Sequence, residues 1–147
     1  MSAITPLCLC LVLLGQTGGD SDEVKAQKKA IFGVLVDQLN AWNKGDLKGF
    51  MAGYHKSPDV SFYSGGNVVK GWDAMLERYQ KKYQGEGKEM GTLTFRELEI
   101  DVLSPESAMV RGRWDLKMTK TNPGGLFTLL MRKTPEGWRI VHDHTSD

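Results

Sequence analysis

The sequence predicts an α+β domain in which a curved antiparallel sheet wraps around about three helices to form a conical barrel. Two patterns indicate this fold. Up to about residue 83 apolar residues mostly recur at helical spacing, and from residue 92 onwards they alternate with polar residues as in strands. Helices followed by a block of strands are typical of an α+β layout. We expect the mouth of the cone to be a pocket.

The length and composition of the chain are those of a single globular domain. Its 147 residues are enough to bury a core without a disulfide or a metal, and 40% are hydrophobic and 25% charged. The formal net charge is +1, and Lys and Arg are spread along the chain. Because no basic stripe is present, nucleic acid is not expected as a partner.

The first residues have the pattern of a secretory signal peptide. An apolar run from Leu7 to Leu14 gives way to small and polar residues, and cleavage is plausible near residues 17–19. The run is too short to span a bilayer. No Lys or Arg precedes it, so a buried N-terminal strand is the alternative. We expect residues 1–19 to be a signal peptide and residues 22–147 to be the domain.

Export would leave a mature protein without cysteines. Cys8 and Cys10 are the two cysteines, and both lie in the leader, so its removal excludes disulfides and thiol catalysis. The prediction is an exported protein, periplasmic or secreted, with no stable membrane anchor after cleavage.

Two helices are expected in the first third of the domain. Apolar residues at helical spacing predict a helix from Asp22 to about Trp42, which Gly45 ends. Asp46 can cap a second, short helix whose apolar face ends at Tyr54.

A hairpin and a third helix follow. The run VSFY-SGG-NVVK predicts two short strands joined by a turn at Gly65 and Gly66. A helix is then expected from about Gly71 to Tyr83, because its large apolar residues fall on one stripe.

The remaining residues predict four strands. In the first, residues 92–104, the apolar positions change parity, and a β-bulge near Arg96–Glu97 would account for the change. The other strands are expected at residues 107–118, 126–133 and 138–145.

Strict alternation along the last strand assigns its side chains to two faces. If Trp138 pairs with Lys133 across the TPEG turn, His142 lies opposite Leu129. Since side chains on one face recur every second residue, His142 and His144 are expected to point toward the helices. Asp143 is expected on the outer face, among arginines that could form a dimer seam.

Two runs carry a resemblance to a known family. They are AWNKGDLKGFMAGYHKSPDVSFYSGGNVVKGWDAMLERY and GGLFTLLMRKTPEGWRIVHDHTS. The chain resembles the nuclear transport factor 2-like (NTF2-like, cystatin-like) superfamily and, within it, the SnoaL-like domains of unknown function. The resemblance implies a conical α+β barrel, a pocket between helices and sheet, and a homodimer formed through the outer face of the sheet.

The family implies no single function, so site residues must be argued from this sequence. Its steroid isomerases place a carboxylate base near the end of the first hairpin strand, but Phe62, Tyr63 and Ser64 occupy that region here. His142 and His144 are therefore the candidate catalytic residues, because imidazole accepts protons near neutral pH. A structural, hydrogen-bonded role is the alternative for both.

The candidate ligand-binding residues are aromatic or apolar side chains expected inside the cone or at its mouth. They are Tyr54, Tyr63, Trp72, Tyr79, Trp114 and Leu129. Packing in the core is the alternative for the two tryptophans and Tyr79. Arg78 is expected in solvent or at the rim.

Three functions stay open at this point. The first is an exported dimer that binds an unknown small, partly apolar molecule. The second is a lyase, isomerase or hydrolase that uses an inward histidine as general base, and the third is an oligomerisation module with a filled cone. No cofactor is expected, and no metal, because neither a carboxylate nor a third histidine is placed beside the two terminal ones.

Overall fold

A computed structural model describes residues 19–146, which form three helices and six strands. In chain order they are α1 (Asp22–Asn43), α2 (Leu47–Met51), β1 (Ser61–Ser64), β2 (Asn67–Lys70), α3 (Trp72–Tyr83), β3 (Thr92–Ser104), β4 (Ser107–Lys117), β5 (Gly124–Thr134) and β6 (Gly137–Thr145). Every helix and strand expected from the sequence is present, with ends within a few residues of the expected positions.

The helix ends follow the capping residues in the sequence. Ser21 caps α1 by accepting a hydrogen bond from the backbone N–H of Val24. Asp46 caps α2 through the N–H of Gly49, at 2.8 Å. The turn between β1 and β2 contains Gly65 and Gly66, both with positive φ, as the hairpin motif requires.

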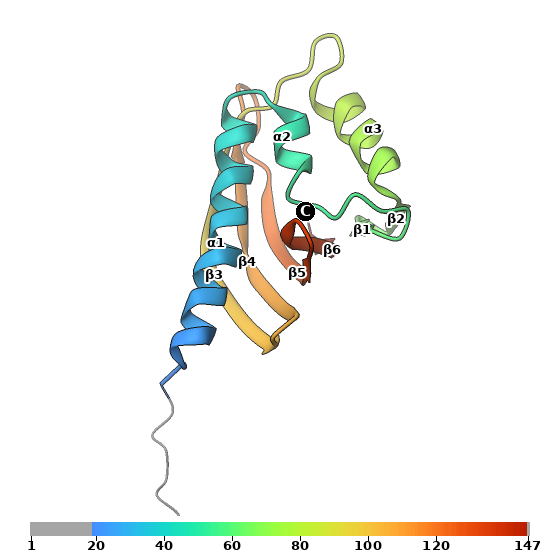
Figure 1. Cartoon of the computed structure of the whole chain (residues 1–147). Coiled ribbons are helices and arrows are strands. Elements are labelled where there is room, and N and C mark those ends of the chain that lie inside the picture. The colour runs from blue at the N-terminus through green and yellow to red at the C-terminus, as the bar shows by residue number, and fades with distance from the viewer. Residues whose placement is uncertain (1–18, 147) are drawn as a thin grey trace, which may run out of the picture.

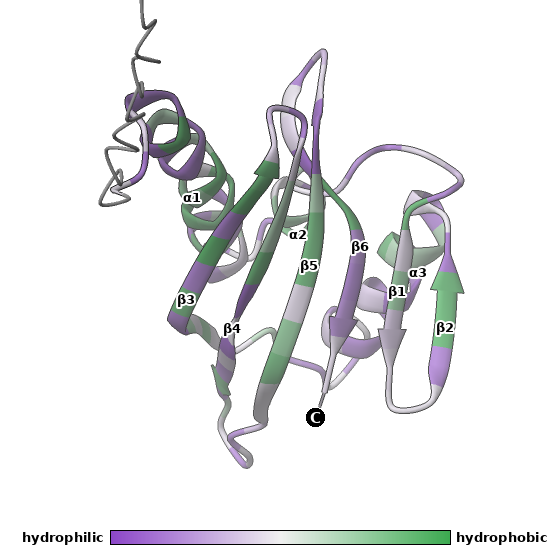
Figure 2. Cartoon of the chain, turned by 90° about the horizontal axis from the view of Figure 1, so that it is seen from below, coloured by the Kyte–Doolittle hydropathy of each residue, from purple (hydrophilic) through white to green (hydrophobic). Residues whose placement is uncertain are grey.

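The six strands form one sheet in the order β2-β1-β6-β5-β4-β3 (Figure 2). Neighbouring strands are antiparallel with one exception, because β1 runs parallel to β6. The sheet is therefore mixed, and the expectation of an entirely antiparallel sheet is wrong at this pair. The parallel pairing is possible because α3 and four strands, β2 to β5, separate β1 from β6 in the chain.

The helices cover one face of the sheet (Figure 1). α1 packs against β3 and α2, and α3 lies beside α2 over the β1–β2 end of the sheet. The core lies between the two layers, where Ile31, Leu35, Met75, Val110 and Met131 are almost completely buried. One end of this interlayer space holds the site described below.

The strand pairing shows three register shifts, of which one, between Val102 and Ser104, lies next to the turn from β3 to β4 and the other two lie within strands. The first lies between Arg96 and Glu99 of β3, where Glu97 has a φ of 53°, and it confirms the bulge expected from the parity change. The second lies in β6. Met131 pairs with Ile140 and Leu130 with His142, so Val141 is an extra residue without a partner.

The outer face of the sheet carries ion pairs between β3 and β4. Arg111 binds Asp101 at 2.6 Å, and Arg96 binds Asp115 at 2.6 Å. Arg111 and Asp115, which were expected at a dimer seam, therefore already have ion-pair partners in their own chain. The homodimer remains a prediction.

The predicted signal peptide falls almost entirely outside the described residues, so cleavage and export stay predictions. Within residues 19–146, no helix is long and apolar enough to cross a membrane.

Candidate functional site

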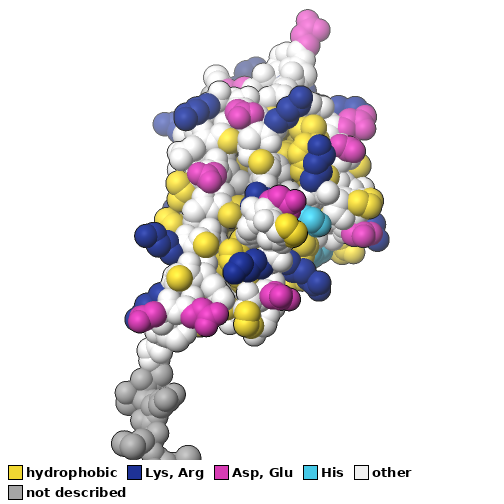
Figure 3. Space-filling model, in the orientation of Figure 1, with side chains coloured by type: hydrophobic (Ala, Val, Ile, Leu, Met, Phe, Trp, Pro, Cys, Tyr) yellow, Lys and Arg dark blue, Asp and Glu magenta, His cyan; other side chains and the backbone are white. Residues whose placement is uncertain are grey.

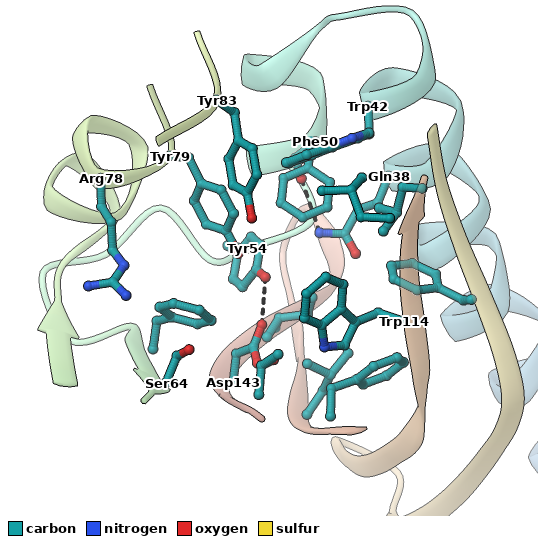
Figure 4. Close-up of a pocket in the computed structure, with 18 of the residues that line it drawn as sticks. Gln38, Trp42, Phe50, Tyr54, Ser64, Arg78, Tyr79, Tyr83, Trp114 and Asp143 are labelled. Carbon is teal, nitrogen blue, oxygen red and sulfur yellow. Dashed lines mark hydrogen bonds between the residues drawn. The ribbon is translucent and has the colours of Figure 1, made fainter. Parts of the chain in front are cut away.

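A cavity of about 90 Å³ lies between the helices and the sheet (Figure 4). Its walls are mostly aromatic and aliphatic. The lining residues are Gln38, Trp42, Phe50, Tyr54, Phe62, Ser64, Arg78, Tyr79, Lys82, Tyr83, Leu93, Phe95, Trp114, Leu116, Phe127, Leu129, Ile140, Asp143 and Thr145. Since about 10–15 Å³ suffices for one water, the cavity has room for several waters or a small ligand.

The last strand places an acid in this cavity. Asp143 is 4% exposed and lies opposite Leu129, whereas His144 is exposed and lies opposite Thr128. The predicted inward orientation of His142 and His144 is therefore wrong, as is the outward orientation of Asp143. The physical reason is the bulge at Val141, which shifts the register by one residue and so exchanges the two faces of the strand beyond it.

Backbone pairing brings Tyr54 to Asp143. The segment after α2 runs alongside β6: the N–H of Ile140 donates to the carbonyl of Gly53 at 2.9 Å, and the N–H of His55 donates to the carbonyl of Ile140 at 2.8 Å. The Tyr54 hydroxyl then donates to Asp143 Oδ2 at 2.7 Å (Figure 4). Tyr54 is itself buried, at 4% exposed.

A second hydroxyl, that of Thr145, also binds the Asp143 carboxylate. Thr145, two residues along the same face of β6, donates from Oγ1 to Asp143 Oδ1 at 2.6 Å. Each carboxylate oxygen of Asp143 thus accepts one hydrogen bond. A carboxylate has about four lone-pair sites, so two acceptor positions remain for a ligand or water.

Burial decides the ionisation of this cluster. It raises the pKa of the Asp143 carboxyl to about 6, although hydrogen bonds from Thr145 and Tyr54 oppose the rise. Burial, and then the neighbouring Asp143 charge, also raise the pKa of the Tyr54 and Tyr79 hydroxyls above their usual range. At neutral pH the cavity therefore holds one ionised carboxylate and neutral phenols, and Asp143 can gain a proton close to neutrality.

Aromatic side chains from the helices form the upper wall of the cavity. Trp42 lies edge-on to Phe50, with ring centroids 5.0 Å apart, and to Tyr83, at 4.9 Å. Tyr79 stacks on Tyr83 at 6.0 Å and contacts Phe50 at 5.5 Å. These contacts fix the wall around Tyr54, because edge-to-face and offset aromatic pairs have preferred geometries.

Two cations from α3 border the cavity. Arg78 lies over the ring of Phe62, with 5.6 Å between its guanidinium carbon and the ring centroid, and Lys82 lies 5.3 Å from the centroid of Tyr83. Figure 3 shows apolar surface bordered by Lys and Arg side chains on the side where α2 and α3 lie. Arg78 is half-buried, so the expectation of a rim position is met and that of full solvation is not.

The predicted ligand-binding residues divide into two groups. Tyr54, Tyr79, Trp114 and Leu129 line the cavity. Trp72 and Tyr63 do not: Trp72 donates from its indole N–H to the carbonyl of Met51 at 2.9 Å. Contact with a ligand remains a prediction for the first group.

Tyr63 and the two histidines form a separate cluster on the outer face. Tyr63 is 39% exposed, and its ring centroid lies 4.9 Å from that of His142 and 5.9 Å from that of His144. His142 Nδ1 is 2.7 Å from Ser61 Oγ. Partial burial, and then His144, lower the pKa of His142. The cluster is separated from the cavity by the sheet.

Sequence reasoning missed Asp143 as a pocket residue, although a signal was present. Ile140 and Val141 are consecutive apolar residues in an otherwise alternating strand, and a parity change of this kind correctly located the bulge in β3. Gln38 and Lys82 were also missed, because nothing in a single sequence distinguishes them from other polar residues on their helices. Within the described residues, no group of three or more His, Cys, Asp or Glu side chains could hold a metal ion.

Comparison with known proteins agrees with this architecture. The model of the SnoaL-like domain matches residues 33–146. An NTF2-like protein of unknown function from Shewanella oneidensis MR-1 is 42% identical, with a TM-score of 0.77 over 82% of this chain and 98% of that one. A search of curated protein sequences found no match.

More distant structures share the fold. An NTF2-like superfamily protein from Salmonella enterica serovar Typhimurium is 22% identical, with a TM-score of 0.68 over 84% of this chain and 92% of that one. A ketosteroid isomerase-like protein from Erwinia carotovora atroseptica is also 22% identical, with a TM-score of 0.61 over 80% and 93%. The family match covers most of the chain, and the chain belongs to the SnoaL-like family of the NTF2-like superfamily.

Proposed function

We propose that this domain binds a small, partly apolar ring compound whose polar group donates a hydrogen bond to Asp143. The observation that carries the proposal is the position of the Tyr54–Asp143 pair in an aromatic-walled cavity. Ligand pockets are typically apolar with a few placed polar groups, and this cavity has that composition.

The chemistry of the cavity narrows the ligand. Asp143 already accepts hydrogen bonds from Tyr54 and Thr145, and its free lone pairs can accept one or two more. A hydroxyl or N–H on the ligand would meet this acceptor, whereas a ligand acid placed there would be repelled by the ionised carboxylate. The cavity volume of about 90 Å³ favours a single ring over a large fused ring system.

The test compares two probes by isothermal titration calorimetry. We expect 4-ethylphenol, which has a ring and a hydroxyl donor, to bind at least tenfold more tightly than ethylbenzene, which lacks the donor. Equal affinity for the two probes would show that Asp143 accepts no hydrogen bond from the ligand. If neither probe gives a heat of binding, the proposal that the cavity binds a ring compound is wrong.

Two matched variants locate the binding site. Leu129→Trp fills the cavity from β5 and should abolish binding, because Leu129 lines the cavity and is 4% exposed. Leu103→Trp makes the same change on β3 at a residue that is 59% exposed and does not line the cavity, and it should leave the affinity unchanged. Circular dichroism shows whether both variants are folded.

A second candidate function is proton-transfer catalysis with Asp143 as the base. The observation that favours it is the pKa of about 6, which suits a general base near neutral pH. The test is exchange of the α-protons of cyclohexanone for deuterium in D₂O, followed by NMR. Catalysis should raise exchange above the buffer rate and be lost in Asp143→Asn, whereas exchange at the buffer rate would leave only the binding function. A histidine base no longer enters this candidate.

The assembly that carries this function is proposed to be an exported homodimer. Support comes from the composition of the leader and, for the dimer, from exposed Leu126 and Tyr63 on the outer face of the sheet. Light scattering on residues 20–147 measures the mass. A dimer that dissociates on Leu126→Glu is expected, and a monomeric wild-type domain would contradict it.

A further inference from the structure

We propose that the ligand is an anion, a ring compound whose carboxylate lies at the border of the cavity between Arg78 and Lys82 while its donor group reaches Asp143. The proposal rests on the proposed function and specifies the ligand class. It adds a second polar contact at the opposite end of the ligand from Asp143.

Arg78 and Lys82 are placed as a pair by α3. They are four residues apart, so they lie on one face of the helix one turn from each other, and both line the cavity. Among the ion pairs between described residues, neither cation has a carboxylate partner within 4 Å. Their charges are therefore available to a ligand.

The neighbouring acids do not compete for these cations. Glu77 lies in a shallow groove that also contacts Arg78 and Lys82, but its carboxylate binds Lys81 at 2.5 Å. Among the described residues that line the cavity, Asp143 is the only acid, and its oxygens accept from Tyr54 and Thr145. A ligand anion is thus repelled by Asp143 and attracted toward α3, which orients the molecule.

Both cations lie beside aromatic rings of the cavity wall, Arg78 half-buried and Lys82 exposed. Arg78 lies over Phe62 and Lys82 over Tyr83, so each charge lies near an aromatic ring. Arg78 is half-buried, and its planar guanidinium can bind a carboxylate through two parallel hydrogen bonds. Holding the half-buried Arg78 side chain in place reduces the entropy lost when a ligand binds.

The probes are three acids and their amides. They are 4-hydroxybenzoate, 4-hydroxyphenylacetate and 3-(4-hydroxyphenyl)propionate, which differ in the distance between hydroxyl and carboxylate. One of the three acids should match the distance between Asp143 and the two cations best. Calorimetry in 20 mM salt should show that this acid binds at least about tenfold more tightly than its amide does. The advantage should shrink in 0.5 M NaCl, because salt screens a partly exposed charge contact.

Two double variants lower the net charge of the protein by the same amount. They distinguish direct contact between the ligand and Arg78 and Lys82 from attraction of the anion by the net charge of the protein. Arg78→Gln with Lys82→Gln should remove the advantage of the acid and leave the affinity for the amide unchanged. Lys29→Gln with Lys133→Gln, at exposed positions on α1 and β5, should keep the advantage.

The outcomes distinguish the two proposals. Equal binding of acids and amides would overturn the anion inference and leave the proposed function standing. An acid advantage that survives in Arg78→Gln with Lys82→Gln would also overturn it. If no acid, no amide and no 4-ethylphenol binds, the proposed function itself fails.

Discussion

The Tyr54 hydroxyl donates a 2.7 Å hydrogen bond to the carboxylate of Asp143, a residue 89 positions later in the chain. The contact joins the end of the second helical segment to the last strand. It exists because β6 contains one extra residue, Val141, which turns Asp143 toward the helices.

Replacing Asp143 by Asn should stabilise the protein at pH 8. The pKa of Asp143 is raised from 3.8 to about 6 in the folded state, so between these values the folded protein holds a proton that the unfolded chain has lost. The free energy of unfolding therefore falls as the pH rises from about 4 to 6, and the full cost, at most about 3 kcal/mol, is present above pH 6. The neutral amide avoids this cost.

Urea denaturation at a series of pH values measures the effect. Asp143→Asn should gain stability relative to wild type between pH 4 and pH 7, with little difference at pH 4. Asp37→Asn, an exposed position on α1, provides the control and should shift stability by less than about 0.5 kcal/mol. A variant equally destabilised at all pH values would contradict the buried, ionisable carboxylate.

Replacing Tyr54 by Phe should destabilise the protein more at high pH than at low pH. The change removes a hydrogen bond to a charged acceptor, which typically contributes about 1.5–3 kcal/mol, and leaves the ionised carboxylate less satisfied. Tyr63→Phe, on the exposed outer face, should have almost no effect on unfolding. If the two variants unfold at the same urea concentration at pH 8, the Tyr54 contact has no energetic role.

Replacing both terminal histidines should leave binding in the cavity intact. His142 and His144 lie on the outer face, next to Tyr63 and Ser61, so His142→Gln with His144→Gln changes no cavity wall. Calorimetry with 4-ethylphenol should give the wild-type affinity. A loss of binding in a folded double variant would place the imidazoles in the site after all.

Two glycine substitutions should have opposite effects on stability. A Cβ at Gly112 would lie 2.7 Å from Phe127 and 2.8 Å from Leu98, so Gly112→Ala forces side chains to move and should cost about 1–3 kcal/mol. Gly33 lies inside α1 with open space around it, so Gly33→Ala should stabilise by about 0.4–1 kcal/mol. Thermal unfolding compares the two, and a stabilising Gly112→Ala would contradict the packing of Phe127 against β4.

The fold was predictable because its signals are local. Helical spacing, the capping residues Ser21 and Asp46 and the Gly65–Gly66 turn each act over a few residues. The parallel pairing of β1 with β6 was missed, because it joins segments about 80 residues apart and leaves no pattern in either strand.

The site was harder to predict because one residue determines it. Alternation along β6 holds up to Ile140, and the pairing of Trp138 with Lys133 was placed correctly. A single unpaired residue, Val141, then exchanges the two faces, so both histidines lie outside and Asp143 inside, the reverse of the prediction. Sequence patterning specifies a face only as far as the next bulge.

The pKa of the Asp143 carboxyl reports directly on the burial of this side chain in the cavity. Protein labelled with ¹³C at the aspartate carboxyl carbon is titrated by NMR, and the resonance missing from Asp143→Asn identifies the residue. We expect its midpoint near pH 6, as burial beside Tyr54 requires. A midpoint at or below pH 4 would contradict the claim that burial controls the ionisation of Asp143.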